Sequence, residues 1–307
     1  MDSRPSEIVI QDGRAYHLGL RPDQVAPHVL LVGDPARALR VAERFERRDH
    51  DERHREFVSI TGVFRGLPVT VVGTGIGTDN VEIAVMELAI LHEFDLATRR
   101  RLPGRPPLTL LRIGTSGGVP RDLAPGTVAV ALYALGLDST GLYYERPPED
   151  DVVRRIEDEA RRLILAATPA GYRFRGRIEP YAARACPEVA AALERALAAR
   201  GLVSRSGITV AVPGFYGASG RYIEGLRNTV PDIKKQLAAL DVDGLRALNF
   251  EMESSLLFHL AGALGYRAGT LCAVISNPHT GEVLLDHRLC VEGCIDAALD
   301  ALVALAG

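Results

Sequence analysis

Three glycine-rich segments follow apolar runs, and each has the composition of a turn that could bind an anion. They are residues 33–37, 73–77 and 114–118. A turn that joins a strand to a helix exposes backbone N–H groups, which suit an anion. A tight turn without a ligand is the alternative for each. Because neither a G-x-G-x-x-G motif with the dinucleotide context nor a G-x-x-x-x-G-K-[ST] motif occurs, a nicotinamide dehydrogenase and a P-loop nucleotidase are disfavoured.

Two arginines lie close to these segments. Arg37 lies one turn into a helix that Asp34 and Pro35 are expected to start, and Arg112 ends a very apolar run at residues 108–111. A guanidinium in such a place is costly unless it is paired or bound to an anion, and its fork matches phosphate oxygens. Arg112 therefore predicts either a phosphate contact or a salt bridge to a carboxylate at the end of the sheet.

Two carboxylates two residues apart form a further candidate. Glu251 and Glu253 flank Met252, and they point the same way if this stretch is extended. They could then hold the vicinal hydroxyls of a sugar. They could also be the acid/base pair of a glycosidase, because their positions on a strand would be about 6.5–7 Å apart. The alternative is the first turn of a helix, which favours acidic side chains.

Residues 213–222 gather aromatic rings, glycines and an arginine after an apolar run. Phe215 could stack on a flat heterocycle, and Arg221 could donate hydrogen bonds to it. An ordinary turn-rich loop is the alternative. Together, these clusters describe a phosphate site, a sugar-hydroxyl site and a base pocket.

The elements that must position these clusters alternate along the chain. Strands are expected at residues 29–33, 57–64, 69–73, 108–113, 127–134, 207–212 and 267–275, and helices at 34–45, 80–94, 152–167, 188–199, 254–264 and 289–305. Residues 247–250 are expected to lead into the helix at 254–264. Residues 97–107 and 138–151 are expected to be surface loops. Apolar strands that alternate with helices predict an α/β fold, with a sheet covered by helices on both faces. We expect a single domain over residues 1–307, with a flexible N-terminal extension at residues 1–16.

The composition restricts the classes of protein. The chain has 307 residues and a net charge of −3, so no basic face for nucleic acid is expected. Only Lys234 and Lys235 are lysines among 36 basic residues, a bias that by itself indicates genomic composition. No signal peptide, membrane span or metal-binding cysteine spacing occurs, and this predicts a cytoplasmic protein with reduced cysteines.

The motifs, in their order along the chain, resemble the uridine phosphorylase branch of the trimeric/hexameric nucleoside phosphorylases. They are HLGL at residues 17–20, GDPxR at 33–37, HREF at 54–57, TGIG at 74–77, LRIGTSG at 111–117, FYxxxGR at 215–221 and FEMES at 250–254. The likeness covers nearly the whole chain and implies a nucleoside phosphorylase-like fold with a mixed central sheet. It also implies the phosphorolysis of a pyrimidine nucleoside, uridine first, to a free base and ribose 1-phosphate.

The resemblance assigns a role to each candidate residue. Those expected to bind phosphate are Gly33, Arg37, Arg112 and Thr115, with Arg55 from a neighbouring subunit. Those expected to bind ribose are Glu251, Met252 and Glu253, with the neighbour's His17 near the 5′-hydroxyl. Those expected to hold the base are Phe215, Ser219 and Arg221. Arg112 and Arg221 would be the catalytic residues.

The same resemblance implies how the enzyme is assembled and what it needs. Because subunits would share sites, we expect a homodimer or a trimer of dimers. No cofactor or metal is expected to take part, and phosphate is a co-substrate. Glu56 matches a carboxylate that in some members helps to bind a monovalent cation between subunits.

The sequence departs from the family at the base pocket. The family usually has Gln two residues before the pocket arginine, and Ser219 stands there. A hydroxyl cannot make the paired donor and acceptor contact of an amide, so a water or a neighbouring side chain must complete uracil recognition, or the pocket takes another base. Asn277 stands where purine-specific relatives have Asp, which disfavours a purine. A nucleosidase and a nucleoside-binding protein with altered base specificity remain alternatives.

Overall fold

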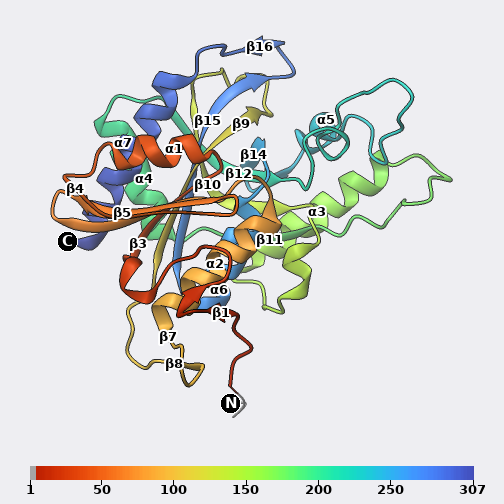
Figure 1. Cartoon of the computed structure of the whole chain (residues 1–307). Helices are drawn as coiled ribbons and strands as arrows, with labels where there is room; N and C mark the ends of the chain where they lie inside the picture. The colour runs from red at the N-terminus through yellow and green to blue at the C-terminus, as the bar shows by residue number, and fades with distance from the viewer. Residues whose placement is uncertain (1–4) are drawn as a thin grey trace.

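The computed structural model describes residues 5–307, and its centre is a mixed β-sheet (Figure 1). The strands of this sheet are β3 (His28–Val32), β4 (Arg47–His54), β5 (Phe57–Phe64), β6 (Leu67–Gly73), β9 (Thr109–Gly118), β10 (Val128–Gly136), β11 (Tyr181–Arg184), β12 (Ser204–Ala211), β13 (Asp241–Val242), β14 (Leu245–Glu251), β15 (Arg267–Asn277) and β16 (Glu282–Val283). Their order is β13-β14-β12-β10-β15-β9-β3-β6-β5-β4, with β11 beside β10 and β16 beside β15.

Part of this sheet closes on itself. The carboxyl end of β14 pairs antiparallel with the carboxyl end of β9, with Phe250 opposite Gly117. This pairing joins the first and last members of the series β14, β12, β10, β15 and β9, so these strands form a closed ring. The ring therefore brings the ends of β9 and β14 to the same place, with Arg112 and Thr115 of β9 near Glu251 of β14.

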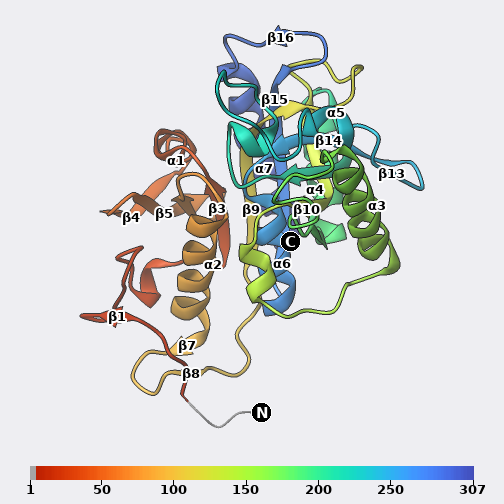
Figure 2. The ribbon, with the colours of Figure 1, turned by 90° about the vertical axis from the view of Figure 1, so that its right-hand side faces the viewer.

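Helices cover both faces of the sheet (Figure 2). They are α1 (Pro35–Ala42), α2 (Thr78–Glu93), α3 (Asp151–Ala167), α4 (Pro187–Ala199), α5 (Ile233–Leu237), α6 (Ser254–Leu264) and α7 (Arg288–Ala306). In β3, Leu30 packs into a core with α1, α4 and α7, whereas its neighbour Leu31 packs into a second core with α2 and α6. Successive strand residues face opposite sides, so both faces are buried. The predicted α/β fold with a mixed sheet covered on both faces is confirmed.

One predicted turn is wrong. Residues 114–118 continue strand β9 instead of forming a turn before a helix. Gly114 pairs with Cys272 of β15, and Gly117 pairs with Ser276 and with Phe250. The small residues are needed for close approach rather than for a turn, because a Cβ at Gly114 would lie 2.3 Å from the Arg112 guanidinium. Long-range pairing of this kind leaves no local signal in the sequence.

The other predicted elements are present, with ends that move by a few residues. Helix α1 starts as predicted, because the Asp34 carboxylate accepts a hydrogen bond from the Ala36 N–H and Pro35 occupies the first turn, but it ends three residues early at Ala42. Strand β4 was not predicted, because Arg47–His54 is almost entirely charged or polar and exposed. It pairs only with β5 at the edge of the sheet, so its side chains do not alternate between core and solvent.

The short elements outside the main sheet form two hairpins. They are β1 (Ile10–Gln11) with β2 (Arg14–Ala15), and β7 (Phe94–Asp95) with β8 (Arg100–Arg101). Of the N-terminal extension predicted at residues 1–16, residues 1–4 lie outside the described part of the chain, and Ile8 and Ala15 are buried. Within residues 5–307, none of the helices has the length and apolar composition needed to cross a bilayer.

Candidate active site

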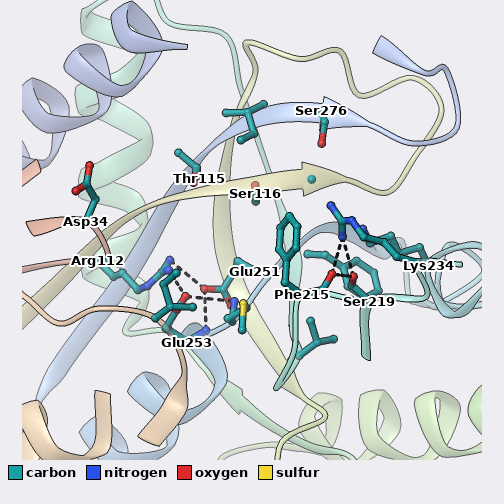
Figure 3. Close-up of a pocket in the computed structure, with 18 of the residues that line it drawn as sticks. Asp34, Arg112, Thr115, Ser116, Phe215, Ser219, Lys234, Glu251, Glu253 and Ser276 are labelled. Carbon is teal, nitrogen blue, oxygen red and sulfur yellow. Dashed lines mark hydrogen bonds and ion pairs between the residues drawn. The ribbon is translucent and has the colours of Figure 1, made fainter. Parts of the chain in front are cut away.

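A cavity of about 670 Å³ opens where the ends of the ring strands meet the loops that follow them (Figure 3). Strand β3 leads into Gly33 and Arg37, β9 carries Arg112 and Thr115, and β14 leads into Glu251. All of the predicted residues expected to act within one subunit line it: Gly33, Arg37, Arg112, Thr115, Phe215, Ser219, Arg221, Glu251, Met252 and Glu253. Residues more than 200 positions apart are therefore brought to one cavity.

Arg112 lies in the wall of this cavity and is bound to both carboxylates. It is 5% exposed, and its Nη1 lies 2.9 Å from Glu251 Oε2 while its Nη2 contacts Glu253. Burial alone would lower the pKa of Arg112, but the carboxylates of Glu253 and Glu251 raise it above its ordinary value. The salt bridge that the sequence left as one alternative is thus present, and the same guanidinium also faces the cavity.

The two carboxylates are held by backbone N–H groups as well. Glu251 accepts hydrogen bonds from the N–H groups of Glu253 (3.1 Å) and Ser254 (3.0 Å), at the start of helix α6. Glu253 accepts one from Gly77 at 2.8 Å. The predicted anion-binding turn at residues 73–77 therefore binds a carboxylate of the protein itself. Burial raises the pKa of Glu251 against the opposing effect of Arg112.

Arg37 is a buried cation, and no carboxylate within residues 5–307 forms a salt bridge with it. It is 7% exposed, its Nη1 donates to the carbonyl oxygen of Ile113 at 3.0 Å, and its Nε is buried without a hydrogen-bond acceptor. Burial and the nearby Arg112 lower its pKa. A buried polar group without a partner costs free energy. An anion in this end of the cavity would supply the missing acceptor and compensate the charge.

The opposite end of the cavity is lined by aromatic and cationic side chains. The Arg221 guanidinium lies over the Phe215 ring, 3.8 Å from its centroid. Its Nη1 donates to the Phe215 carbonyl oxygen and to Ser219 Oγ, both at 2.8 Å. Ser219 in turn donates to the Phe215 carbonyl oxygen, so its hydroxyl is used to hold the loop and the guanidinium. Ser219 lies at the predicted place, but its hydroxyl is already hydrogen-bonded within the protein.

Four polar residues of the cavity were not among the predicted site residues: Asp34, Ser116, Lys234 and Ser276. Ser116 has a buried hydroxyl without a hydrogen-bond partner, and Lys234 lines the same end as Phe215. Lys234 had one visible signal, because a lysine is rare in a chain whose basic residues are otherwise arginines. The short helix α5 that carries it shows no motif, so only the fold places it here.

Three predicted residues, His17, Arg55 and Glu56, lie outside the cavity. The His17 Nδ1 contacts Glu87 Oε1 at 2.7 Å, and the His17 carbonyl oxygen accepts a hydrogen bond from His54 Nδ1 at 2.9 Å. Arg55 is exposed and its guanidinium lies 4.6 Å from the centroid of the Tyr16 ring. Glu56 is exposed beside it. None of His17, Arg55 and Glu56 lines the cavity of its own chain.

Asn277 has a structural role. It is buried, its Nδ2 donates to the carbonyl oxygens of Pro120 (2.8 Å) and Leu123 (2.9 Å), and its Oδ1 accepts from the His279 N–H (2.9 Å). These contacts use both ends of the amide. Between residues 5 and 307, no group of three or more His, Cys, Asp or Glu side chains could hold a metal ion.

Comparisons with protein families, with curated proteins and with solved structures all match this chain to nucleoside phosphorylases. The model of the Phosphorylase superfamily matches residues 27–304. A uridine phosphorylase of Thermococcus kodakarensis is 30% identical over 89% of this chain and 80% of its own length. A uridine phosphorylase of Haemophilus influenzae is 31% identical over 87% of this chain and 88% of its own. A crystal structure of Trypanosoma brucei nucleoside phosphorylase, described as showing uridine phosphorylase activity, superimposes with a TM-score of 0.85 at 28% identity, covering 96% of this chain and 99% of that one.

Proposed function

The chain belongs to the phosphorylase superfamily, and on that premise we propose that it is a pentosyltransferase that converts uridine and phosphate into uracil and ribose 1-phosphate. One observation carries the proposal. A single cavity has a buried cationic end at Arg37 and Arg112, a carboxylate pair next to it, and an aromatic and cationic end at Phe215 and Arg221. This is the order in which phosphate, ribose and base are joined during phosphorolysis.

Phosphate binds at the cationic end of the cavity, and its position there determines the reaction. The unpartnered Nε of Arg37 and the guanidinium of Arg112 hold the dianion, with the Gly33 backbone and Thr115 beside them. As the glycosidic bond lengthens, the ribose gains oxocarbenium character, and the adjacent dianion stabilises it before attacking the anomeric carbon. Catalysis is therefore positional and electrostatic and needs no covalent nucleophile.

The carboxylates and the aromatic loop bind the rest of the nucleoside. Glu251 and Glu253 accept hydrogen bonds from the ribose hydroxyls, and Met252 packs against the sugar. Phe215 contacts the base, while Arg221 stabilises the negative charge that develops on it. Because Ser219 and Asn277 are hydrogen-bonded within the protein, neither is free to read a base edge or to protonate a purine. This supports a pyrimidine substrate.

The proposed reaction is tested by incubating the enzyme with a panel of uridine, thymidine, cytidine, adenosine and inosine in phosphate buffer. The measurement is the released base. We expect uracil release from uridine to be fastest. Faster release of a purine base would show that the pocket is built for another substrate, and binding without any turnover would favour a nucleoside-binding protein.

A nucleosidase is the less favoured reaction. Hydrolysis uses water, so it gives no reason to keep Arg37 buried and unpaired at 7% exposure beside Arg112. Such an arrangement destabilises the protein unless an anion occupies it. The arginine pair therefore favours phosphate as the second substrate.

Ser219 gives a prediction of moderate size. In Ser219→Ala, Arg221 loses one of two acceptors that orient it, and a hydrogen bond of this kind contributes about 0.5–1.5 kcal/mol. We expect kcat/KM for uridine to fall about two- to tenfold, mainly through KM, while KM for phosphate stays the same. Steady-state kinetics with each substrate varied in turn measures both values. Unchanged uridine kinetics would mean that Ser219 does not orient Arg221.

Two subunits are expected to share each active site, in a homodimer or a trimer of dimers. His17 and Arg55 are held in defined positions by Glu87, His54 and Tyr16, yet they lie outside the cavity of their own chain. Within one chain they have no ligand to contact. A neighbouring subunit that receives them explains the arrangement: His17 then reaches the 5′-hydroxyl, and Arg55 the phosphate.

Three further expectations stay predictions: a bound cation, the absence of a cofactor, and the location of the protein. A monovalent cation is expected to bind between subunits at Glu56, whose carboxylate is exposed on the surface of the chain. No cofactor enters the proposed reaction, and a cytoplasmic location is still expected.

Shared sites predict that two inactive variants complement each other. We expect His17→Ala and Arg37→Met to be impaired separately. After mixing and subunit exchange, half of the dimers are hybrids with one intact site, so activity should recover to about one quarter of the wild-type value. The assay follows uridine turnover, with exchange verified by tags on the two variants. Complete exchange without recovery would contradict the sharing of sites.

A further inference from the structure

Lys234 is carried to the base end of the cavity by the short helix α5, which two of its residues anchor in the core. Ile233 and Leu237 of α5 are buried against the apolar residues of α3, and Lys234 follows Ile233 directly. Its side chain lines the main cavity and also an adjoining one of about 340 Å³. Figure 3 shows it at the same end as Phe215 and Ser219. The anchors hold its ammonium at the point where a base would lie.

The ammonium of Lys234 lacks a counter-charge. Among the described residues, no carboxylate pairs with it and no hydrogen bond holds it. The centroid of the Phe250 ring is 5.7 Å from its Nζ, and the cationic Arg221 lies near enough to act on it electrostatically. Burial, helped by Arg221, lowers the pKa of Lys234 to about 8. Lys235 shows the contrast, since it is exposed and lies 3.4 Å from Asp232.

Two cations at one end of a cavity repel each other, so the site favours a ligand with negative charge or carbonyl oxygens there. An ammonium only donates hydrogen bonds. A pyrimidine-2,4-dione has two carbonyl oxygens, and when it leaves as an anion its negative charge spreads onto both. Ser219 is already bonded to the loop, and Lys234 is the cationic side chain beside Arg221 that can complete recognition.

We propose that Lys234 is a catalytic residue that donates a hydrogen bond to a carbonyl oxygen of the pyrimidine and, with Arg221, stabilises the negative charge of the departing base. The inference rests on the proposed function. The C1′–N1 bond breaks with its electron pair on the base, and a phosphate oxygen forms the new bond to C1′. The proton of hydrogen phosphate reaches the base through solvent, so Lys234 remains protonated throughout.

The ionisation of Lys234 also predicts a pH dependence. The ammonium is charged below its pKa of about 8, so kcat/KM for uridine should fall as the pH rises through this value. The charged or titratable groups that line the two cavities around it are Asp34, Arg37, Arg112, Arg221, Asp232, Lys235, Glu251, Glu253, His279 and Glu282. Any of these groups could change the activity with pH. If the decrease in kcat/KM near pH 8 comes from Lys234, a substitution of Lys234 alone must remove that decrease.

The test compares Lys234→Met and Lys234→Arg with Lys235→Met as the matched control. We expect Lys234→Met to lower kcat/KM for uridine at least about tenfold, because a charge-assisted hydrogen bond is lost. The loss should be smaller for 5-fluorouridine, whose base is a more stable anion. Lys234→Arg should retain most activity and lose the pH limb near 8, because a guanidinium stays protonated. Lys235→Met should behave as wild type.

The outcomes separate this inference from the proposed function. If the wild-type enzyme releases uracil and a folded Lys234→Met stays within twofold of it, the role of Lys234 is wrong while the function stands. Equal losses for uridine and 5-fluorouridine would also overturn it, since a merely structural role does not depend on the leaving group. A wild-type enzyme that releases no uracil from uridine overturns the proposed function and the inference with it.

Discussion

Replacing Arg112 with alanine is expected to abolish uridine phosphorolysis and also to destabilise the fold. The guanidinium is the shared counter-charge of Glu251 and Glu253, both of which are buried with it. Removing one partner of a buried ion pair leaves an uncompensated charge and costs about 3–5 kcal/mol. The phosphate contact is lost as well. We expect a fall in kcat of at least about a hundredfold, measured beside thermal unfolding.

Two comparisons separate the loss of catalysis from the loss of stability. Arg112→Lys keeps a positive charge near the carboxylates but cannot contact phosphate and both of them through one fork. It should be more stable than Arg112→Ala and still be strongly impaired. Arg112→Ala should regain stability as the pH is lowered, because burial raises the pKa of Glu251, which then takes up a proton. A folded Arg112→Ala that is as active as wild type at low phosphate would remove Arg112 from the phosphate site.

Replacing Arg37 with methionine is expected to cost activity without costing stability. Arg37 is buried next to Arg112, and in the described part of the chain it has no carboxylate partner and keeps an unsatisfied Nε. Methionine fills much of the same space without a charge to desolvate. In the absence of phosphate, the variant should therefore be at least as stable as wild type. Its kcat/KM for phosphate should fall at least about a hundredfold, because one side of the proposed phosphate site is removed.

The two properties are measured by phosphate titration of thermal unfolding and by phosphate kinetics. A ligand at a hundred times its Kd stabilises a protein by about 2.7 kcal/mol, which wild type should show and Arg37→Met should lack. Arg40→Met is the control, since Arg40 lies on the same helix but pairs with Glu292 at 2.9 Å. If Arg37→Met kept the full stabilisation by phosphate, Arg37 would not be a phosphate ligand.

Much of the fold could be predicted because its signals are local. Strand β3 is apolar on both faces, and Asp34 and Pro35 mark the start of α1 as capping chemistry requires. Strand β4 could not be predicted in the same way, because it is a charged strand at the edge of the sheet. Residues 114–118 look like a turn, and only the pairing of β9 with β14 and β15 makes them a strand.

Parts of the candidate site could be predicted where burying a charged residue costs free energy unless it has a partner. Arg112 at the end of an apolar run indicated a buried cation with an anionic partner. The sequence left open whether that partner is a carboxylate or phosphate, and the structure shows carboxylates on one side and the cavity on the other. Lys234 follows no motif. Its position depends on how Ile233 and Leu237 anchor α5, which is tertiary information.

The central claim is most directly tested by the products that wild-type enzyme forms from uridine with and without phosphate. The account predicts that uracil appears only when phosphate is present and that one ribose 1-phosphate forms for each uracil. Both products can be followed in one reaction, by chromatography for uracil and phosphorus NMR for the sugar phosphate. Uracil released in phosphate-free buffer together with free ribose would contradict it, because water rather than phosphate would then be the second substrate.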